Sequence, residues 1–155
     1  MKFASPLLVV CDMERSRAFY REVLGLRVIS DFGANITFTG GVSLQTKESW
    51  EDFIHKPAGG IAFGGNDAEL YFEEDDFDAF LGRLELLGGV EYVHPPQEHD
   101  WGQRVVRFYD PDRHIIEVGE SMRVVCRRFL DEGMTPQQVA KRTQMPERFV
   151  KSCIK

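Results

Sequence analysis

The sequence contains the same order of secondary structure elements twice, and this duplication is the strongest constraint on its fold. In each half the hydrophobic pattern predicts a buried strand, an amphipathic helix and three short strands. The elements expected in the first half cover residues 3–10, 13–24, 26–31, 35–39 and 42–46, and those in the second half cover residues 68–73, 77–87, 91–93, 104–109 and 114–119. Each helix follows an acidic cap, carries the dipeptide Ala-Phe and ends at a glycine. The sequence therefore predicts two related modules of about 60 residues each.

The segment between the modules and the segment after them differ from this pattern. Residues 47–66 contain a proline and two glycine pairs, which indicates a connection. We therefore expect one domain over residues 1–120, with modules at about 1–46 and 67–120, and a helical C-terminal extension over residues 121–155.

The extension has the pattern of a short helical bundle. One helical face is formed by Met122, Val125, Cys126 and Phe129. A second helix is expected to begin at Thr135 and Pro136, and a third after Pro146, which gives the order of a helix-turn-helix. The extension is basic, but pairs of short amphipathic helices are common as packing elements. We therefore favour a structural role over DNA binding, and we do not expect a nucleic-acid partner.

Charge and hydropathy define the compartment we expect. The chain of 155 residues carries a net charge of −6, and residues 1–119 hold 11 Lys and Arg against 21 Asp and Glu. An acidic body argues against a broad phosphate-binding surface and favours cationic ligands or simple solubility. No apolar run approaches the roughly 18 residues of a membrane helix. The first residues make a poor signal peptide, so we expect a cytoplasmic protein without a membrane partner.

Three segments resemble the vicinal oxygen chelate superfamily, which includes glyoxalase I, bleomycin-resistance proteins, fosfomycin-resistance proteins and extradiol dioxygenases. They are VVCDMERSRAFYREVLGLRV, ELYFEEDDFDAFLGRLELLGG and RFYDPDRHIIEVGE. The most specific piece is Asp110-Pro111-Asp112, which leads into a strand that carries Glu117. The resemblance covers about residues 3–120 and implies an α+β fold, in which two βαβββ modules form a cup-shaped mixed sheet. It also implies a homodimer, because members often complete their cups across a two-fold axis.

The resemblance also implies where a metal would bind, and this sequence departs from the family there. The four positions that face the cup in metal-dependent members fall on Ser5, Gln45, Glu69 and Glu117. Two of these positions usually hold histidine, whereas this chain has Ser5 and Glu69. Glu69 and Glu117, with Gln45, are candidate ligands for manganese, magnesium or calcium, whereas nickel or zinc is not expected. A cofactor-free protein and a protein with a divalent ion both remain open.

Further candidate site residues follow from strand alternation and from the loops. Tyr71 shares a strand face with Glu69, and Trp101 offers a flat ring at the mouth of the cup, so both are candidate ligand-binding residues, as are Ser5 and Gln45. Trp50 is expected in a loop, and His94, which precedes Pro95 and Pro96, is expected in a surface turn. His99, between two acidic residues, is the candidate general acid or base beside Glu117.

Arg107 is a further candidate ligand-binding residue, although alternation does not say which face of its strand points inward. An inward Arg107 would pair with Glu117 and compete with a metal ion.

Three hypotheses for function follow, and whether the protein is an enzyme stays open. The first, which we favour, is a small-molecule binding protein of the bleomycin-resistance kind, without the histidine-containing metal site. The second is a lyase, isomerase or dioxygenase that depends on a divalent metal, as glyoxalase I does. The third is a ligand sensor that controls the helix-turn-helix-like extension.

Overall fold

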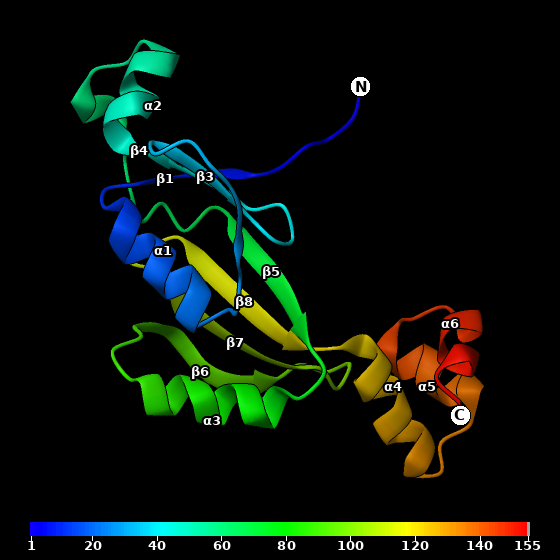
Figure 1. Cartoon of the computed structure of the whole chain (residues 1–155). Coiled ribbons are helices and arrows are strands. Elements are labelled where there is room, and N and C mark those ends of the chain that lie inside the picture. Colours follow the sequence, from blue (N-terminus) through cyan, green and yellow to red (C-terminus); the bar gives the residue numbers. More distant parts are fainter. Residues whose placement is uncertain (155) are drawn as a thin grey trace. The chain divides into compact units, whose positions relative to one another are not determined.

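A computed structural model describes residues 1–154 of the chain, apart from the side chain of Ala58 (Figure 1). It divides into two compact units. The first contains Met1–Ala68 together with Tyr109–His114, and the second contains Glu69–Phe108 and the chain from Ile115 onward. Each unit holds one sheet of four strands, and the element order along the chain is βαβββ twice. The α+β class and the duplicated modules are therefore confirmed. None of the helices in the described part of the chain is long and apolar enough to cross a membrane.

The first sheet has the strand order β1-β4-β3-β2, in which β1 runs parallel to β4 and the other pairs are antiparallel. The module consists of β1 (Leu7–Val10), α1 (Met13–Glu22), β2 (Val28–Asp31), β3 (Asn35–Phe38) and β4 (Ser43–Thr46). Asp12 caps α1 as expected, because its side chain accepts a hydrogen bond from the backbone N–H of Arg15 at 3.0 Å. The first strand begins at Leu7, so the expected strand over residues 3–10 was too long at its start.

One face of the first sheet is apolar and packs against α1. Ile36 and Leu44 are adjacent in register and fully buried. The ring of Tyr20 stacks on Phe38 with centroids 5.5 Å apart. Alternation then places Asn35, Thr37, Ser43 and Gln45 on the opposite face, which is polar.

The loop after β7 adds a buried carboxylate to the first unit. The side chain of Asp110 is fully buried and accepts four hydrogen bonds. The donors are the Tyr20 hydroxyl at 3.0 Å, the His114 ring Nδ1 at 2.8 Å, and the backbone N–H groups of Asp112 and His114 at 2.9 and 2.8 Å. These bonds compensate for the removal of the carboxylate from water. The Asp-Pro-Asp segment therefore has a structural role.

The second sheet has the order β5-β8-β7-β6, with β5 parallel to β8 and β6 antiparallel to β7. The module consists of β5 (Glu69–Glu74), α3 (Phe77–Leu87), β6 (Tyr92–Glu98), β7 (Arg104–Tyr109) and β8 (Ile115–Glu120). The strand predicted over residues 91–93 ends too early, and the turn predicted at His94-Pro95-Pro96 was wrong. β6 continues through both prolines because it is an edge strand, where a missing N–H costs no ladder bond.

The connection between the modules contains a helix that the sequence analysis missed. α2 (Lys47–Ile54) follows β4 directly, and a short 3₁₀ turn spans Ala58–Gly60. Trp50 therefore lies on a helix, not in a loop. It lines a cavity of about 330 Å³ in the first unit, together with Phe63 and His114.

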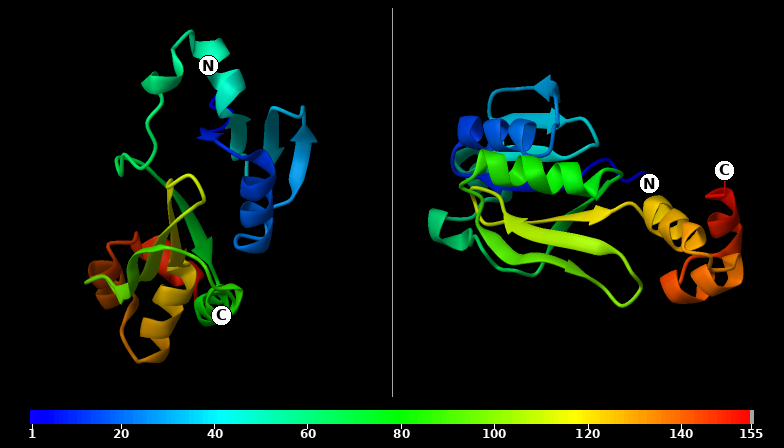
Figure 2. Two further views of the ribbon diagram at one scale, coloured as in Figure 1. Left: turned by 90° about the vertical axis from the view of Figure 1, so that its left-hand side faces the viewer. Right: turned by 90° about the horizontal axis from the view of Figure 1, so that it is seen from below.

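The C-terminal extension belongs to the second unit and has a small core of its own. Its helices are α4 (Met122–Asp131), α5 (Pro136–Thr143) and α6 (Glu147–Ser152), which form a group beyond the end of β8 (Figures 1 and 2). The buried side chains of this core are Val125, Cys126, Phe129, Val139, Val150 and Cys153. Thr135 and Gln138 form a capping box at the start of α5, which confirms the cap expected from the sequence.

α4 docks onto the loop between β6 and β7. The guanidinium of Arg128 donates a hydrogen bond of 2.6 Å to the carbonyl oxygen of Gly102 and pairs with the buried Glu120 at 3.2 Å. Gly102 has a φ of +88°, and a side chain there would overlap the ring of Phe129. This close approach requires a glycine.

Tyr20→Phe tests the Asp110 cluster. At neutral pH the substitution is expected to lower the free energy of unfolding by about 1–2 kcal/mol, because a buried carboxylate loses a donor. Burial, with the nearby charge of Asp110, raises the pKa of Tyr20 well above its ordinary value. The unfolded chain therefore releases this proton near pH 10 while the folded chain keeps it, and stability falls as the pH rises above about 10.

Urea denaturation of the wild type and of Tyr20→Phe at pH 7 and pH 11 measures the two effects. The decrease in unfolding free energy from pH 7 to pH 11 is expected to be smaller in Tyr20→Phe. Tyr109→Phe is the control, because the Tyr109 hydroxyl bonds Asn66 at an exposed site. Equal alkaline losses in wild type and Tyr20→Phe would contradict the assignment.

Gly102→Ala tests the docking of α4. We expect a loss of about 3 kcal/mol in unfolding free energy, from backbone strain and from overlap with Phe129. Gly133→Ala separates the two causes, since Gly133 has a φ of +91° with no atom within 4 Å of an added methyl group. It is expected to cost only about 1 kcal/mol. Thermal unfolding followed by circular dichroism gives both values, and equal losses would argue against the close approach.

Candidate functional site

Arg107 links the two candidate metal-binding carboxylates on one face of the second sheet. Its Nε lies 2.8 Å from an oxygen of Glu69, and its Nη2 pairs with Glu117. Its Nη1 lies 3.2 Å from Nε2 of His94 on the neighbouring strand. Arg107 therefore lies on the same face as Glu117, which answers the question that strand alternation left open.

This arrangement bears on the metal that the family resemblance implies. A divalent ion needs several free oxygen or nitrogen donors, and a guanidinium between two carboxylates competes for them. Glu117 is 8% exposed at its side chain, and Arg107 supplies the opposite charge that such burial requires. The residues of the second sheet therefore do not fit a divalent metal. Within residues 1–154, no group of three or more histidine, cysteine or acidic side chains is arranged so that it could hold a metal ion.

The polar face of the first sheet is neutral. The Oγ of Ser5 lies 3.2 Å from the Oγ of Ser43, which also bonds Thr37 at 2.9 Å. Gln45 is 3% exposed, and its amide oxygen accepts a hydrogen bond of 2.8 Å from Asn35. Its amide nitrogen donates to Ser49 at 2.6 Å, so both ends of the side chain have partners. Gln45 is therefore a member of a hydrogen-bonded network and a poor metal ligand.

A hydrogen-bonded chain leads along the second sheet from the β6–β7 loop. The indole N–H of Trp101 donates to Gln103 at 3.1 Å, and the Gln103 amide donates to the Tyr71 hydroxyl at 2.9 Å. Tyr71 in turn donates to Glu73 at 3.2 Å. Partial burial raises the pKa of Tyr71, so the hydroxyl keeps its proton for this bond. Gly119 leaves room for these hydrogen-bonded side chains, since a Cβ atom there would lie 2.9 Å from the amide nitrogen of Gln103.

The two candidate catalytic residues have different partners. The ring of His99 stacks on Trp101 with centroids 4.2 Å apart. Glu117 pairs with Arg107, and its register neighbour on β5 is Tyr71. Their role in catalysis stays a prediction.

Sequence reasoning missed Gln103 and His94. Gln103 is 6% exposed and joins Trp101 to Tyr71, but a single glutamine at the start of a strand carries no pattern that marks it. His94 was assigned to a turn because two prolines follow it. The edge position of β6 explains both the error and the contact with Arg107.

Comparison with known proteins identifies the family. A family model described as a Glyoxalase-like domain matches residues 3–123. The chain therefore belongs to the glyoxalase-like family, within the superfamily of glyoxalases, bleomycin-resistance proteins and dioxygenases. The part of the extension after residue 123 lies outside the matched segment.

Two solved structures and one curated relative are similar to this chain. A crystal structure of a protein of unknown function from Agrobacterium tumefaciens str. C58 is 41% identical, with a TM-score of 0.70 over 78% of this chain and 94% of that one. A lactoylglutathione lyase from Agrobacterium tumefaciens is 25% identical, with a TM-score of 0.60 over 78% and 94%. An uncharacterized protein of Shewanella frigidimarina is 38% identical over 79 residues, and the chain spans half the length of that curated relative.

Arg107→Met tests whether the guanidinium stabilises the two carboxylates. The substitution keeps an apolar stem but leaves the nearly buried Glu117 without its cation, so we expect a loss of about 2 kcal/mol in unfolding free energy. Arg21→Met is the matched control, because Arg21 pairs with Glu22 at the surface and its loss is expected to cost at most about 0.5 kcal/mol. Urea denaturation at pH 7 measures both, and equal values would show that Arg107 does not stabilise the site.

Proposed function

We propose that this protein binds a small organic molecule on the polar sheet faces of its glyoxalase-like domain, without a divalent metal. The observation that carries this proposal is the position of Arg107 between Glu69 and Glu117. Those two residues stand where the family resemblance implies metal ligands, and the arginine supplies the positive charge that a metal would otherwise provide.

The neutral face of the first sheet supports the same proposal. Ser5 offers a hydroxyl, and Gln45 holds the neighbouring polar groups of Asn35 and Ser49 in place by hydrogen bonds. Such groups orient a ligand by hydrogen bonding, while neighbouring apolar side chains bury its body. Tyr71 and Trp101 are the aromatic residues that we expect to contact the ligand in the second module.

A metal-dependent lyase, isomerase or dioxygenase is the second candidate function. It is favoured by Glu117, which follows the Asp-Pro-Asp segment as the resemblance requires, and a lactoylglutathione lyase is among the similar structures. We also propose that the protein is a homodimer, which sedimentation equilibrium tests directly.

Elemental analysis and thermal unfolding with a metal panel decide between the two functions. After chelator treatment, the wild-type protein is expected to contain no stoichiometric metal and to show no change in Tm with manganese, magnesium, calcium, nickel, zinc or cobalt. Arg107→Met is expected to gain a Tm increase with manganese, because the two carboxylates then lack a cation.

A stoichiometric metal in the wild-type protein, lost together with its Tm increase in Glu117→Gln, would overturn the proposal in favour of the enzyme. If no metal binds, a thermal-shift screen with aromatic and cationic small molecules follows. A screen without any stabilising compound would count against the binding function.

A further inference from the structure

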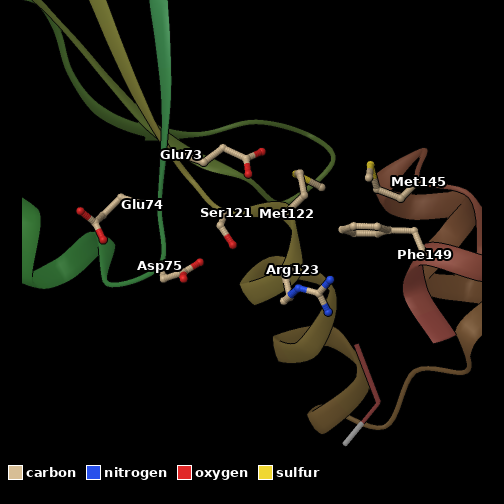
Figure 3. A pocket seen from close by; sticks show the side chains of 8 residues that line it. All are labelled: Glu73, Glu74, Asp75, Ser121, Met122, Arg123, Met145 and Phe149. Atoms are coloured by element: carbon tan, nitrogen blue, oxygen red, sulfur yellow. The ribbon is translucent and has the colours of Figure 1, made fainter. Parts of the chain in front are cut away.

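A pocket of about 690 Å³ lies between the end of β5 and the C-terminal extension, within the second unit. Figure 3 shows the side chains that line it, which come from β5 and the turn after it, from the start of α4 and from α6 with the preceding turn. A volume of this size lies in the range of small-molecule sites. None of the site residues predicted from the sequence lines this pocket, and neither does Arg107 or His94.

One side of this pocket is apolar and fixed. Met122, Met145 and Phe149 line it, and all three pack against the buried core of the extension. Their inner surfaces are held by that core while their outer surfaces face the pocket. Methionine side chains adapt to ligands of different shape, and a phenyl ring adds a flat apolar surface. This wall is therefore suited to the apolar body of a ligand.

The opposite side is acidic. The carboxylates of Glu73 and Asp75 point toward the space in front of Ser121, whereas that of Glu74 points away from it (Figure 3). Glu74 instead accepts a hydrogen bond from the backbone N–H of Asp76 at 3.2 Å. Glu73 accepts one hydrogen bond from Tyr71, which leaves further lone pairs available.

The single arginine of the lining does not neutralise these carboxylates. Arg123 donates a hydrogen bond of 3.1 Å to the carbonyl oxygen of Ser152, and its guanidinium lies 5.6 Å from the centre of the Phe149 ring. These contacts hold it against α6. In the described chain, Arg123 forms no ion pair with Glu73 or Asp75, so the acidic side keeps its negative potential.

We propose that this pocket binds a small organic cation that carries an apolar body, such as an alkyl or aryl ammonium ion. The ammonium group lies against Glu73 and Asp75, and the apolar body lies against Met122, Met145 and Phe149. The site depends on the extension, because Met145 and Phe149 come after residue 123, where the match to the glyoxalase-like domain ends. Its lining shares no residue with the site proposed for the sheet faces, although Tyr71 of that site donates a hydrogen bond to Glu73.

Methyl NMR of the full chain tests the proposal at the level of single residues. The protein is labelled with ¹³C at the methionine methyl groups and titrated with benzyltrimethylammonium chloride. The methyl signals of Met122 and Met145 are expected to shift with saturation, at a Kd of about 1 mM or below. The signals of Met13 and Met134, which do not line the pocket, are expected to stay in place.

Two further probes separate charge from shape. Phenylacetate has a similar aromatic body with a negative charge, and benzyl alcohol has one without a charge. Both are expected to leave the Met122 and Met145 signals unchanged at the same concentration. Equal shifts with phenylacetate or benzyl alcohol would overturn the proposed preference for cations. Unchanged signals of Met122 and Met145 throughout the benzyltrimethylammonium titration would overturn the site.

A pair of double variants tests the carboxylates. Glu73→Gln with Asp75→Asn is expected to weaken benzyltrimethylammonium binding about tenfold. Glu48→Gln with Asp52→Asn changes the net charge equally at exposed positions of α2, outside the pocket, and is expected to leave the Kd within about twofold. Equal weakening by both pairs would show that only the overall charge of the protein matters, and would contradict the site.

Discussion

The hydrogen bonds of the buried Asp110 carboxylate are the interactions on which the loop between β7 and β8, and the strands beside it, depend most directly. The carboxylate accepts four hydrogen bonds, two from backbone groups of its own loop and two from side chains. These bonds hold the loop that connects β7 to β8. Arg107 precedes this loop by three residues and Glu117 follows His114 by three. The geometry of the turn therefore sets the register that brings this arginine and this carboxylate together.

Local signals in the sequence predicted most of the secondary structure. The caps at Asp12 and Thr135 were recognisable because each places a side-chain oxygen before an apolar helix face. The duplicated order of elements predicted both modules. The later part of β6 and the whole of α2 were missed. β6 is an edge strand that continues through two prolines, and α2 is a helix in a glycine-rich connection, so position outweighs local residue preference in both.

The site could be predicted only in part, since its properties depend on contacts between distant residues. Alternation placed Tyr71 on the face of Glu69, and the family resemblance placed Glu117 with them. The side of β7 that carries Arg107 is fixed by packing of the whole sheet. One guanidinium then pairs with two carboxylates and contacts an imidazole. Arginine is suited to this because its donors lie in one plane and diverge. Likewise, the pocket beside the extension combines residues at the end of β5 with residues of the extension and could not be predicted from spacing.

The positions of the two tryptophans give each unit its own optical reporter. The chain contains only Trp50 and Trp101. Trp50 lines a cavity of the first unit beside His114, whereas Trp101 stacks on His99 and donates a hydrogen bond to Gln103 in the second. A neighbouring imidazole and a hydrogen-bonded indole N–H both make emission sensitive to small displacements. Replacing one indole at a time would therefore let fluorescence follow the unfolding and ligand response of one half of the molecule separately from the other.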